Sequence, residues 1–293
     1  MAIIPPFFMD AVVALGVELP NKQKYWTGTG FLVGRKEEND PTQSTVYIIT
    51  NKHVIRNQNL LYVRFNNQGE SGVKDLPMGL VDANGSPIYS EHPLRNVDVV
   101  AIQIIPQVIL DNKLSLSFFD LQRHSLDLAQ MKATGVDEGS LIYSLGFPMN
   151  LVNASVKAPI CRLGCISRVA DAFVNPNTAE QFLVDAQVFP GNSGGPIVSR
   201  PEHISIEGTP HNSSANLIGI LSAYIPYRET LYSRQTGLDR MIQEENSGLT
   251  IVHPVDRIKE VVEMEWNRVE ALRAALPSKD AEPIQKEESG TPV

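Results

Sequence analysis

The stretch FPGNSGGPIVS, residues 189–199, places a single serine, Ser193, among three glycines and shortly before a proline. Gly191 allows a turn in which its own N–H and the N–H of Ser193 point into one small space. Gly194 and Gly195 leave room for a carbonyl carbon to approach the hydroxyl. The stretch fits a serine nucleophile with two donors for an oxyanion, and its alternative is a glycine-rich turn with a solvated serine.

The composition indicates a globular protein that can bury a sizeable core. Of its 293 residues, 42% are hydrophobic and 20% are charged. The net charge of -8 leaves no surplus of basic side chains to neutralise phosphates, which argues against a nucleic-acid partner. The sequence lacks a run of about 18 uninterrupted apolar residues, so no membrane partner is expected.

The N-terminal sequence and the cysteines predict a cytoplasmic protein without a cofactor. No lysine or arginine precedes Lys22, so the basic start of a signal peptide is missing. Cys161 and Cys165 are too few for a disulfide framework. Within one strand they would lie about 13 Å apart, too far for a bridge. We expect two reduced, buried thiols and no metal site.

Short apolar segments separated by polar or glycine-containing turns dominate the chain, and their lengths are those of strands. Long amphipathic helices do not alternate with them, which argues against a parallel sheet of βαβ units. The pattern predicts an all-β fold of antiparallel barrels. The segments are residues 10–17, 28–34, 44–51, 60–65, 98–105, 140–147, 182–189, 195–199, 217–225 and 248–252.

From Pro254 onward the apolar residues recur at helical spacing, which predicts a terminal amphipathic helix over 255–275. Its apolar positions are Val255, Ile258, Val262, Val269 and Leu272. The polar residues after it are expected to be disordered. The predicted organisation is an N-terminal barrel (1–115), a connector (116–135), a C-terminal barrel (136–253), a terminal helix (254–276) and a disordered tail (277–293).

His53 and Asp98 are the candidate partners of the serine. His53 follows an apolar segment in YIITNKHVI (47–55), and Asp98 stands at the head of DVVAIQI (98–104). A lone histidine or aspartate more often has a structural role. A serine hydroxyl, however, needs an adjacent base, and the order His53, Asp98, Ser193 supplies a base, an orienting carboxylate and a nucleophile.

Together these residues resemble the chymotrypsin-like serine proteases, most closely the bacterial HtrA/Deg type without a PDZ module. The matching blocks, in chain order, are GTGFLV (28–33), TNKHVI (50–55), DVVAIQI (98–104), YSLGFP (143–148), CRLGCISR (161–168), VDAQVFPGNSGGPIVS (184–199) and IGILSAY (218–224). The resemblance implies two antiparallel six-stranded β-barrels with a C-terminal helix. It also implies that Ser193 is the nucleophile, His53 the general base and Asp98 the group that orients the histidine.

The resemblance implies a substrate site as well. The N–H groups of Gly191 and Ser193 would form an oxyanion hole. The backbone of Ser222, Ala223 and Tyr224 would pair with an extended peptide, as an added strand pairs with a sheet edge. The predicted activity is that of a serine endopeptidase acting on unfolded or extended protein segments.

Side-chain preference is predicted from Gln187 and Tyr224. Gln187 takes the position, six residues before the serine, that usually forms the floor of the primary specificity pocket. Its neutral side chain offers no charge to bind lysine or arginine, and the ring of Tyr224 narrows the pocket mouth. We expect a preference for small or medium uncharged residues at the cleaved position.

The sequence departs from the secreted enzymes at Asn192, where they have an aspartate that pairs with an N-terminal amine released by proteolysis. A neutral Asn192 needs no such partner, so activation by cleavage is not expected. No PDZ module is expected after the second barrel. The loop 200–216 is long, with His203 and His211 expected on its surface, and the polar segment 226–247 is expected to border the substrate groove.

Two rival functions are weighed against the endopeptidase. The presence of His53, Asp98 and Ser193 together argues against a catalytically silent binding module. Relatives that have drifted to inactivity have usually lost at least one of the three residues. An α/β-hydrolase esterase is suggested by the letters GNSGG, which fit G-x-S-x-G. In that class the serine precedes its partners and a helix follows it, whereas here both partners come first and Pro196 follows.

Phe7 and Phe8 leave the oligomeric state open. HtrA-like proteins often trimerise through an aromatic N-terminal segment, so a homo-oligomer is one interpretation of these residues. The other interpretation is that the segment PPFFMDAVVALGV fills the interior of its own barrel.

Overall fold

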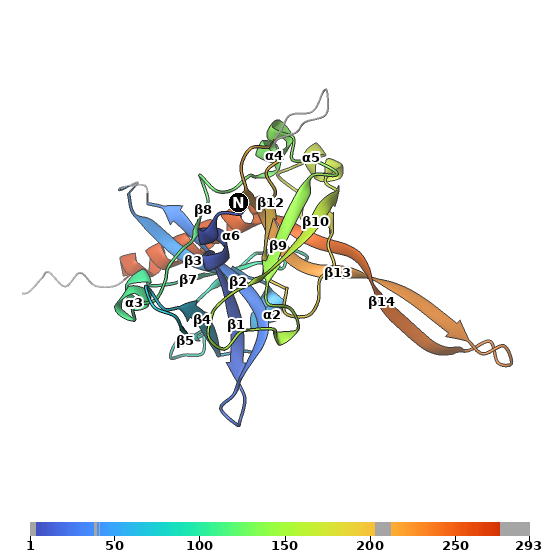
Figure 1. Cartoon of the computed structure of the whole chain (residues 1–293), viewed down its shortest axis with the longest axis horizontal. Helices are drawn as coiled ribbons and strands as arrows, with labels where there is room; N and C mark the ends of the chain where they lie inside the picture. Colours follow the sequence, from blue (N-terminus) through green and yellow to red (C-terminus); the bar gives the residue numbers. More distant parts are fainter. Residues whose placement is uncertain (1–3, 38–39, 41, 203–211, 276–293) are drawn as a thin grey trace, which may run out of the picture.

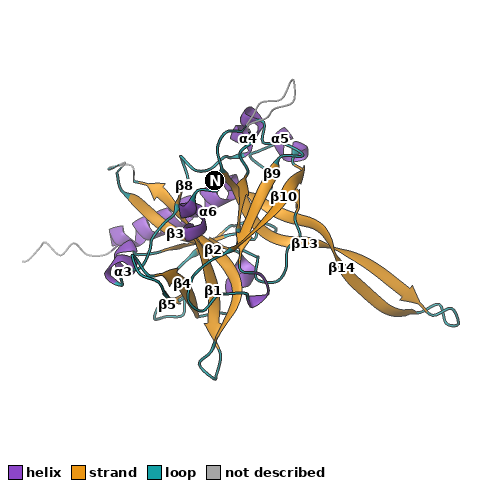
Figure 2. Cartoon of the chain, viewed as in Figure 1, coloured by secondary structure: helices purple, strands orange, loops and turns teal. Residues whose placement is uncertain are grey.

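The computed structural model of the chain describes residues 4–37, 40, 42–202 and 212–275. Two β structures lie side by side, and a long helix, α6 (Val255–Ala275), runs along them (Figure 1). Strands are the predominant regular secondary structure, and the other helices are short (Figure 2). The predicted all-β class with a C-terminal helix is therefore confirmed.

The first half forms an eight-stranded sheet in the order β5-β4-β1-β2-β3-β7-β6, with β8 beside β2. Its two ends approach each other where Ile88, just before β6, donates to the carbonyl of Leu80, just after β5. This half has eight strands where six were predicted, because β6 and β8 are too short to produce an apolar run. The strands are β1 (Val12–Glu18), β2 (Lys24–Lys36), β3 (Ser44–Thr50), β4 (Leu60–Asn66), β5 (Val73–Gly79), β6 (Ser90–Glu91), β7 (Val100–Gln103) and β8 (Phe119–Asp120).

The second half is a closed barrel of six strands in the order β10-β11-β14-β13-β12-β9, as predicted. Beyond the barrel, the polar segment 226–247 continues the last two strands as a two-stranded arm that projects from the body (Figure 1). The strands are β9 (Leu141–Gly146), β10 (Ile160–Arg168), β11 (Phe182–Asp185), β12 (Pro196–Ser199), β13 (Asn216–Tyr232) and β14 (Asp239–Pro254).

Short helices occupy the connections. The best-defined is α4, where Asp127 and Gln130 form a reciprocal capping box and Gly135 ends the helix with a φ of 73°. This helix and β8 lie inside the predicted connector, which is thus more regular than expected. The short helices are α1 (Pro6–Ala11), α2 (Lys52–Ile55), α3 (Pro106–Asp111), α4 (Leu128–Thr134), α5 (Ala170–Val174) and the 3-10 turn η1 (Pro148–Asn150).

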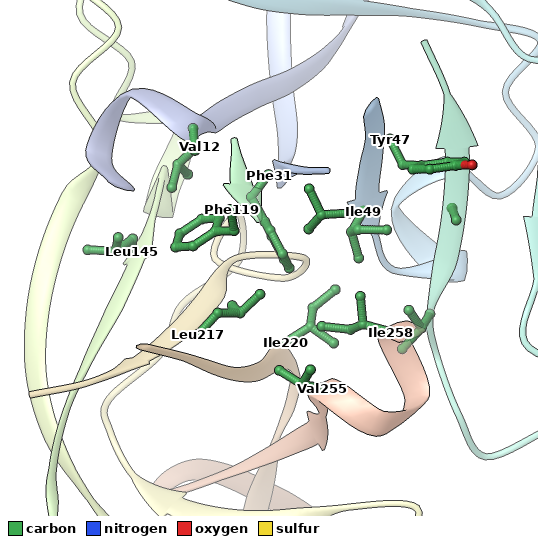
Figure 3. Close-up of a cluster of buried hydrophobic side chains, with 14 of the residues drawn as sticks. Val12, Phe31, Tyr47, Ile49, Phe119, Leu145, Leu217, Ile220, Val255 and Ile258 are labelled. Carbon is green, nitrogen blue, oxygen red and sulfur yellow. The ribbon is translucent and has the colours of Figure 1, made fainter. Parts of the chain in front are cut away.

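One hydrophobic cluster joins the two halves and α6. Side chains from both β structures and from the first turns of the helix point into the same space (Figure 3). We call this cluster the shared core. Because burial of these side chains needs both halves at once, the core fixes their relative position. Its members include Val12, Phe31, Tyr47, Ile49, Phe119, Leu145, Leu217, Ile220, Val255 and Ile258.

The buried face of α6 is shorter than the predicted stripe. Val255, Ile258 and Val262 are buried as expected, but Leu272 is 55% exposed. The buried stripe ends at Glu265, which is fully buried and accepts hydrogen bonds from Ser90 Oγ at 2.8 Å and from Arg268. Beyond this polar anchor the helix no longer packs its apolar positions fully against the body.

The N-terminal aromatic residues lie inside the chain's own core. Phe8 is buried, with its ring centroid 4.5 Å from that of Phe119. Phe7 packs edge-on against Phe8 with 4.7 Å between the centroids. This placement agrees with the second interpretation of the segment, and homo-oligomerisation stays a prediction.

The cysteines differ from expectation. Both are free, but Cys161 is exposed and Cys165 is half-buried. Alternation along β10 directs these two side chains outward, whereas Ile166 lies in the barrel interior.

Some expectations concern parts of the chain that the structure does not address. His203, His211 and the tail 277–293 lie outside the described residues. In the described part of the chain, no helix has the length and apolar character needed to cross a membrane.

Truncation of Ile258 tests the contribution of α6 to the shared core. Ile258→Ala removes buried methyl groups and leaves a cavity, so we expect the free energy of unfolding to fall by about 3 kcal/mol. Leu272→Ala is the control on the exposed part of the same helix, with an expected change below about 0.5 kcal/mol. Urea denaturation followed by circular dichroism measures both. Equal losses for the two variants would contradict the proposed docking of the helix.

Candidate active site

The pairing of β3 with β7 brings His53 and Asp98 together. Thr50, at the end of β3, lies opposite Val100 at the start of β7. His53 sits in α2, the single turn after β3, and Asp98 lies just before β7. His53 Nδ1 is 2.5 Å from Asp98 Oδ2, and the His53 backbone N–H donates to Asp98 Oδ1 at 3.2 Å. With Nδ1–H donating to the carboxylate, Nε2 is left as the acceptor.

Asp98 is held as a carboxylate by its surroundings. Burial alone would raise its pKa, but hydrogen bonds and the charge interaction with His53, together with a bond from Ser222, lower the pKa below its usual value. Ser222 Oγ donates to Asp98 Oδ2 at 3.2 Å, and Asn51 Nδ2 donates to the Asp98 carbonyl at 2.6 Å. These bonds orient the carboxylate toward the histidine.

The Gly191 backbone is arranged to present N–H donors. Gly191 has a φ of 99°, and a Cβ there would lie 2.4 Å from the Phe147 carbonyl oxygen, so only glycine fits. The Met149 N–H donates to the Pro190 carbonyl at 2.6 Å. The Pro190 carbonyl and the Gly191 N–H belong to one planar trans peptide, so the N–H points in the direction opposite to the carbonyl. Within the described residues, the N–H groups of Gly191 and Ser193 donate to no other group.

The hydroxyl of Ser193 is bound to a backbone carbonyl. Ser193 is half-buried, and its Oγ donates to the Ser222 carbonyl at 3.2 Å. The structure records no hydrogen bond between Ser193 Oγ and the ring of His53, both of which are described residues. The Ser193 hydroxyl is therefore directed to Ser222, although Ser193 and His53 line the same cavity.

Thr29, which the sequence analysis did not single out, connects the first half to the serine loop. Its Oγ1 donates to the Gly191 carbonyl at 2.6 Å and accepts from the Phe147 N–H at 3.0 Å. Its backbone N–H donates to the Ser193 carbonyl at 2.9 Å. The signal in the sequence was a threonine within the apolar segment GTGFLV (28–33). Thr29 is fully buried in the fold, and a buried hydroxyl requires hydrogen-bond partners.

A cavity of about 460 Å³ lies beside the serine. Its lining includes the imidazole of His53 but no carboxylate, lysine or arginine. Such a cavity suits an uncharged side chain. The lining consists of Thr27, His53, Val188, Phe189, Pro190, Gly191, Ser193, Leu221, Ser222, Ala223 and Tyr224.

The predicted substrate-binding residues are only partly found at this cavity. Ser222, Ala223 and Tyr224 line it, with Ala223 and Tyr224 exposed. Gln187 is exposed and lies outside the lining, and Val188 takes its place. Burial alternates along residues 185–188, so Gln187 faces solvent whereas Val188 is buried. No cluster of metal-binding side chains is found among the described residues.

His253 is a second residue that the sequence analysis missed. It is buried, its Nε2 accepts the Asp98 backbone N–H at 3.1 Å, and its Nδ1 lies 2.8 Å from the Glu180 carbonyl. This pattern requires the neutral ring with the proton on Nδ1. Burial lowers the pKa of His253 and so favours this neutral form. Its partner Asp98 lies far away in the sequence, so no local motif reveals the contact.

Acidification should weaken the fold through His253. Its pKa is lower in the folded chain than in the unfolded chain, where it is about 6.5. As the pH falls below that value, the unfolded chain takes up the proton first, so the free energy of unfolding decreases. Urea unfolding at pH 7.5 and pH 5.5 should show a smaller decrease for His253→Gln than for the wild type. An identical decrease would contradict this role, because His92 and His124, whose pKa values burial also lowers, remain in both proteins.

Comparison with known proteins gives the family. Residues 28–203 match the sequence profile of the trypsin-like peptidase domain, a span that contains His53, Asp98 and Ser193. The structure is also similar to the crystal structure of the MamO protease domain from Magnetospirillum magneticum in its apo form. That similarity has a TM-score of 0.47 with 17% sequence identity, over 87% of this chain and 97% of that chain. No curated protein matches the chain in sequence. Since the profile match covers more than half of the chain, this protein belongs to the trypsin-like peptidase domain family.

Proposed function

We propose that the protein is a serine endopeptidase that hydrolyses peptide bonds through an acyl-enzyme. One observation carries the proposal. An oriented His53–Asp98 pair adjoins the cavity that Gly191 and Ser193 also line, and among the described residues the N–H groups of Gly191 and Ser193 have no protein partner. A base with its orienting carboxylate, a nucleophile and oxyanion donors are the parts that acyl transfer requires.

In the proposed reaction, Ser193 Oγ turns from the Ser222 carbonyl to His53 Nε2 and attacks the scissile carbonyl. His53 takes the hydroxyl proton, and Asp98 stabilises the imidazolium that forms. The N–H groups of Gly191 and Ser193 bind the oxyanion, an arrangement worth about 3 kcal/mol per donor. His53 then gives its proton to the leaving amine, and water releases the acyl group by the same base catalysis.

Substrate binding would release the nucleophile from its resting orientation. The Ser222 carbonyl, which now accepts from Ser193 Oγ, belongs to the strand expected to pair with an extended peptide. A substrate N–H bound to that carbonyl would compete with the Ser193 hydroxyl. The hydroxyl is then free to rotate to His53. The need for an extended backbone favours unfolded or extended protein segments, as expected for an HtrA-like peptidase.

A second candidate function is a catalytically silent binding module. The observation that favours it is the bond from Ser193 Oγ to Ser222 in place of one to His53. In this alternative, extended peptides bind to β13 beside the cavity without being cleaved. The two candidates make opposite predictions for covalent labelling of the serine.

Labelling with a fluorophosphonate probe tests the proposed nucleophile. We expect one adduct on the wild type by intact mass, and none on Ser193→Ala or His53→Ala, because the first lacks the nucleophile and the second its base. Ser71→Ala, which changes an exposed serine between β4 and β5, is the control and should label like the wild type. A folded wild type that binds extended peptides but forms no adduct would favour the binding module.

Cleavage of matched peptides tests the predicted preference. Peptides with alanine, valine or leucine at the cleaved position should have kcat/KM values at least about tenfold above those with arginine, lysine or aspartate, because the cavity offers no countercharge. Tyr224→Ala should widen the preference toward larger residues. Gln187→Ala is its control, because Gln187 lies outside the cavity lining. Preferred cleavage after arginine or lysine would refute the prediction.

A further inference from the structure

Lys157 is a buried cation that the proposed mechanism does not use. It lies in the segment 148–159, between β9 and β10 of the second half, and its side chain is 0% exposed. Its Nζ is 3.2 Å from Asp10 Oδ1 and donates to the Val12 carbonyl at 3.0 Å, and also to the Asp10 carbonyl. A buried ammonium is tolerated only with such partners, so Lys157 ties the segment to the N-terminal residues of the chain.

The partners of Lys157 are themselves fixed to the first half. Asp10, in α1, accepts from Ser115 Oγ at 2.5 Å. Asn66, at the end of β4, accepts the Lys157 backbone N–H at 2.7 Å and donates to the Lys157 carbonyl at 3.1 Å. Both the side chain and the backbone of Lys157 are therefore held by groups of the first half.

The other end of the same segment is conformationally restrained. Met149 and Asn150 have φ values of 54° and 58°, in the left-handed region that residues with a Cβ rarely adopt. Such a backbone persists only where its surroundings hold it. Asn150 Oδ1 accepts from the Trp26 N–H at 2.9 Å, and the Asn153 carbonyl accepts from Arg64 at 2.8 Å. Contacts with the first half thus run along the segment.

Met149 is the point where this segment meets the serine loop. Its N–H donates to the Pro190 carbonyl at 2.6 Å, and that bond sets the plane of the peptide that carries the Gly191 N–H. If Met149 moved away, the Pro190 carbonyl would lose its donor and the peptide would be free to rotate. The Gly191 N–H would then no longer face the reacting carbonyl.

We propose that Lys157, through its buried ion pair with Asp10, is a positioning residue that keeps the segment 148–159 docked and so holds the Gly191 N–H in place for the oxyanion. This inference rests on the proposed endopeptidase function of the site. Asn192, next to Gly191, is neutral and its buried Nδ2 has no partner among the described residues. Asn192 therefore cannot form the ion pair that the corresponding aspartate forms in the secreted enzymes. In this chain the ion pair that holds the loop is that of Lys157 with Asp10, and it acts through the segment 148–159.

Hydrogen exchange measures the proposed link without relying on activity. The Met149 amide should be protected in the wild type, because its N–H is bonded to Pro190. In Lys157→Met the peptides covering 147–152 should exchange at least about tenfold faster under conditions where the protein is folded. Lys259→Met is the matched control, since it removes the lysine of a part-exposed ion pair with Asp127 at 2.9 Å. Exchange at 147–152 should be unchanged in this control.

Reactivity toward the fluorophosphonate probe provides the second readout. We expect labelling of Lys157→Met to be at least about tenfold slower than that of the wild type, in line with the loss of an oxyanion donor. The double variant Asp10→Asn with Lys157→Met removes both charges and avoids an unpaired buried carboxylate, which keeps the test valid if the single variant does not fold. It should show the same fast exchange and slow labelling.

The outcomes separate the two proposals. If amide hydrogen exchange at 147–152 is as slow in the folded variants as in the wild type, the proposed role of Lys157 is overturned, whatever the labelling rate. Fast exchange with wild-type labelling would also overturn it, because the segment would then not control the donor. A wild type that is never labelled would instead refute the proposed function, and the exchange data alone would decide whether the ion pair holds Met149.

Discussion

The hydrogen bonds of Thr29 are the constraint on which the serine site depends. A buried hydroxyl must find partners, and Thr29 finds them across the boundary between the two halves, at Gly191 and Phe147. Its backbone N–H adds a bond to the Ser193 carbonyl. These bonds fix the carbonyls of Gly191 and Ser193, and among the described residues the N–H groups of the same two residues have no protein partner. The first half therefore shapes the loop of the second half that carries the serine.

The residues of the whole site are likewise contributed by both halves. His53 and Asp98 come from the first half, whereas Ser193 and the cavity wall at Ser222 come from the second. The relative position of these residues therefore depends on how the two halves pack against each other. The shared core and α6 supply that contact, because their burial requires both β structures in one arrangement (Figure 3).

Buried polar groups at the boundary are tied to long-range partners. His253 holds the backbone of Asp98, Glu265 of α6 binds Ser90, and Lys157 binds Asp10. Each of these contacts would be costly to break, since one partner would be left buried and unsatisfied. Such contacts define a single arrangement more sharply than apolar packing does, and the one made by His253 reaches Asp98 directly.

The order of the amino acids was sufficient to predict the strand pattern, the six-stranded second barrel, α6 and the candidate residues His53, Asp98 and Ser193. The strand pattern and α6 follow from local periodicity, and the candidate residues follow from short motifs in which glycines and polar residues meet specific chemical requirements. The six strands of the barrel follow from the family resemblance that these motifs carry. The contacts of Thr29, His253 and Lys157, and the position of Gln187 outside the cavity, became visible only in the folded chain. The partners of these residues lie far away in the sequence, and no local pattern encodes which distant groups meet when two β structures pack together.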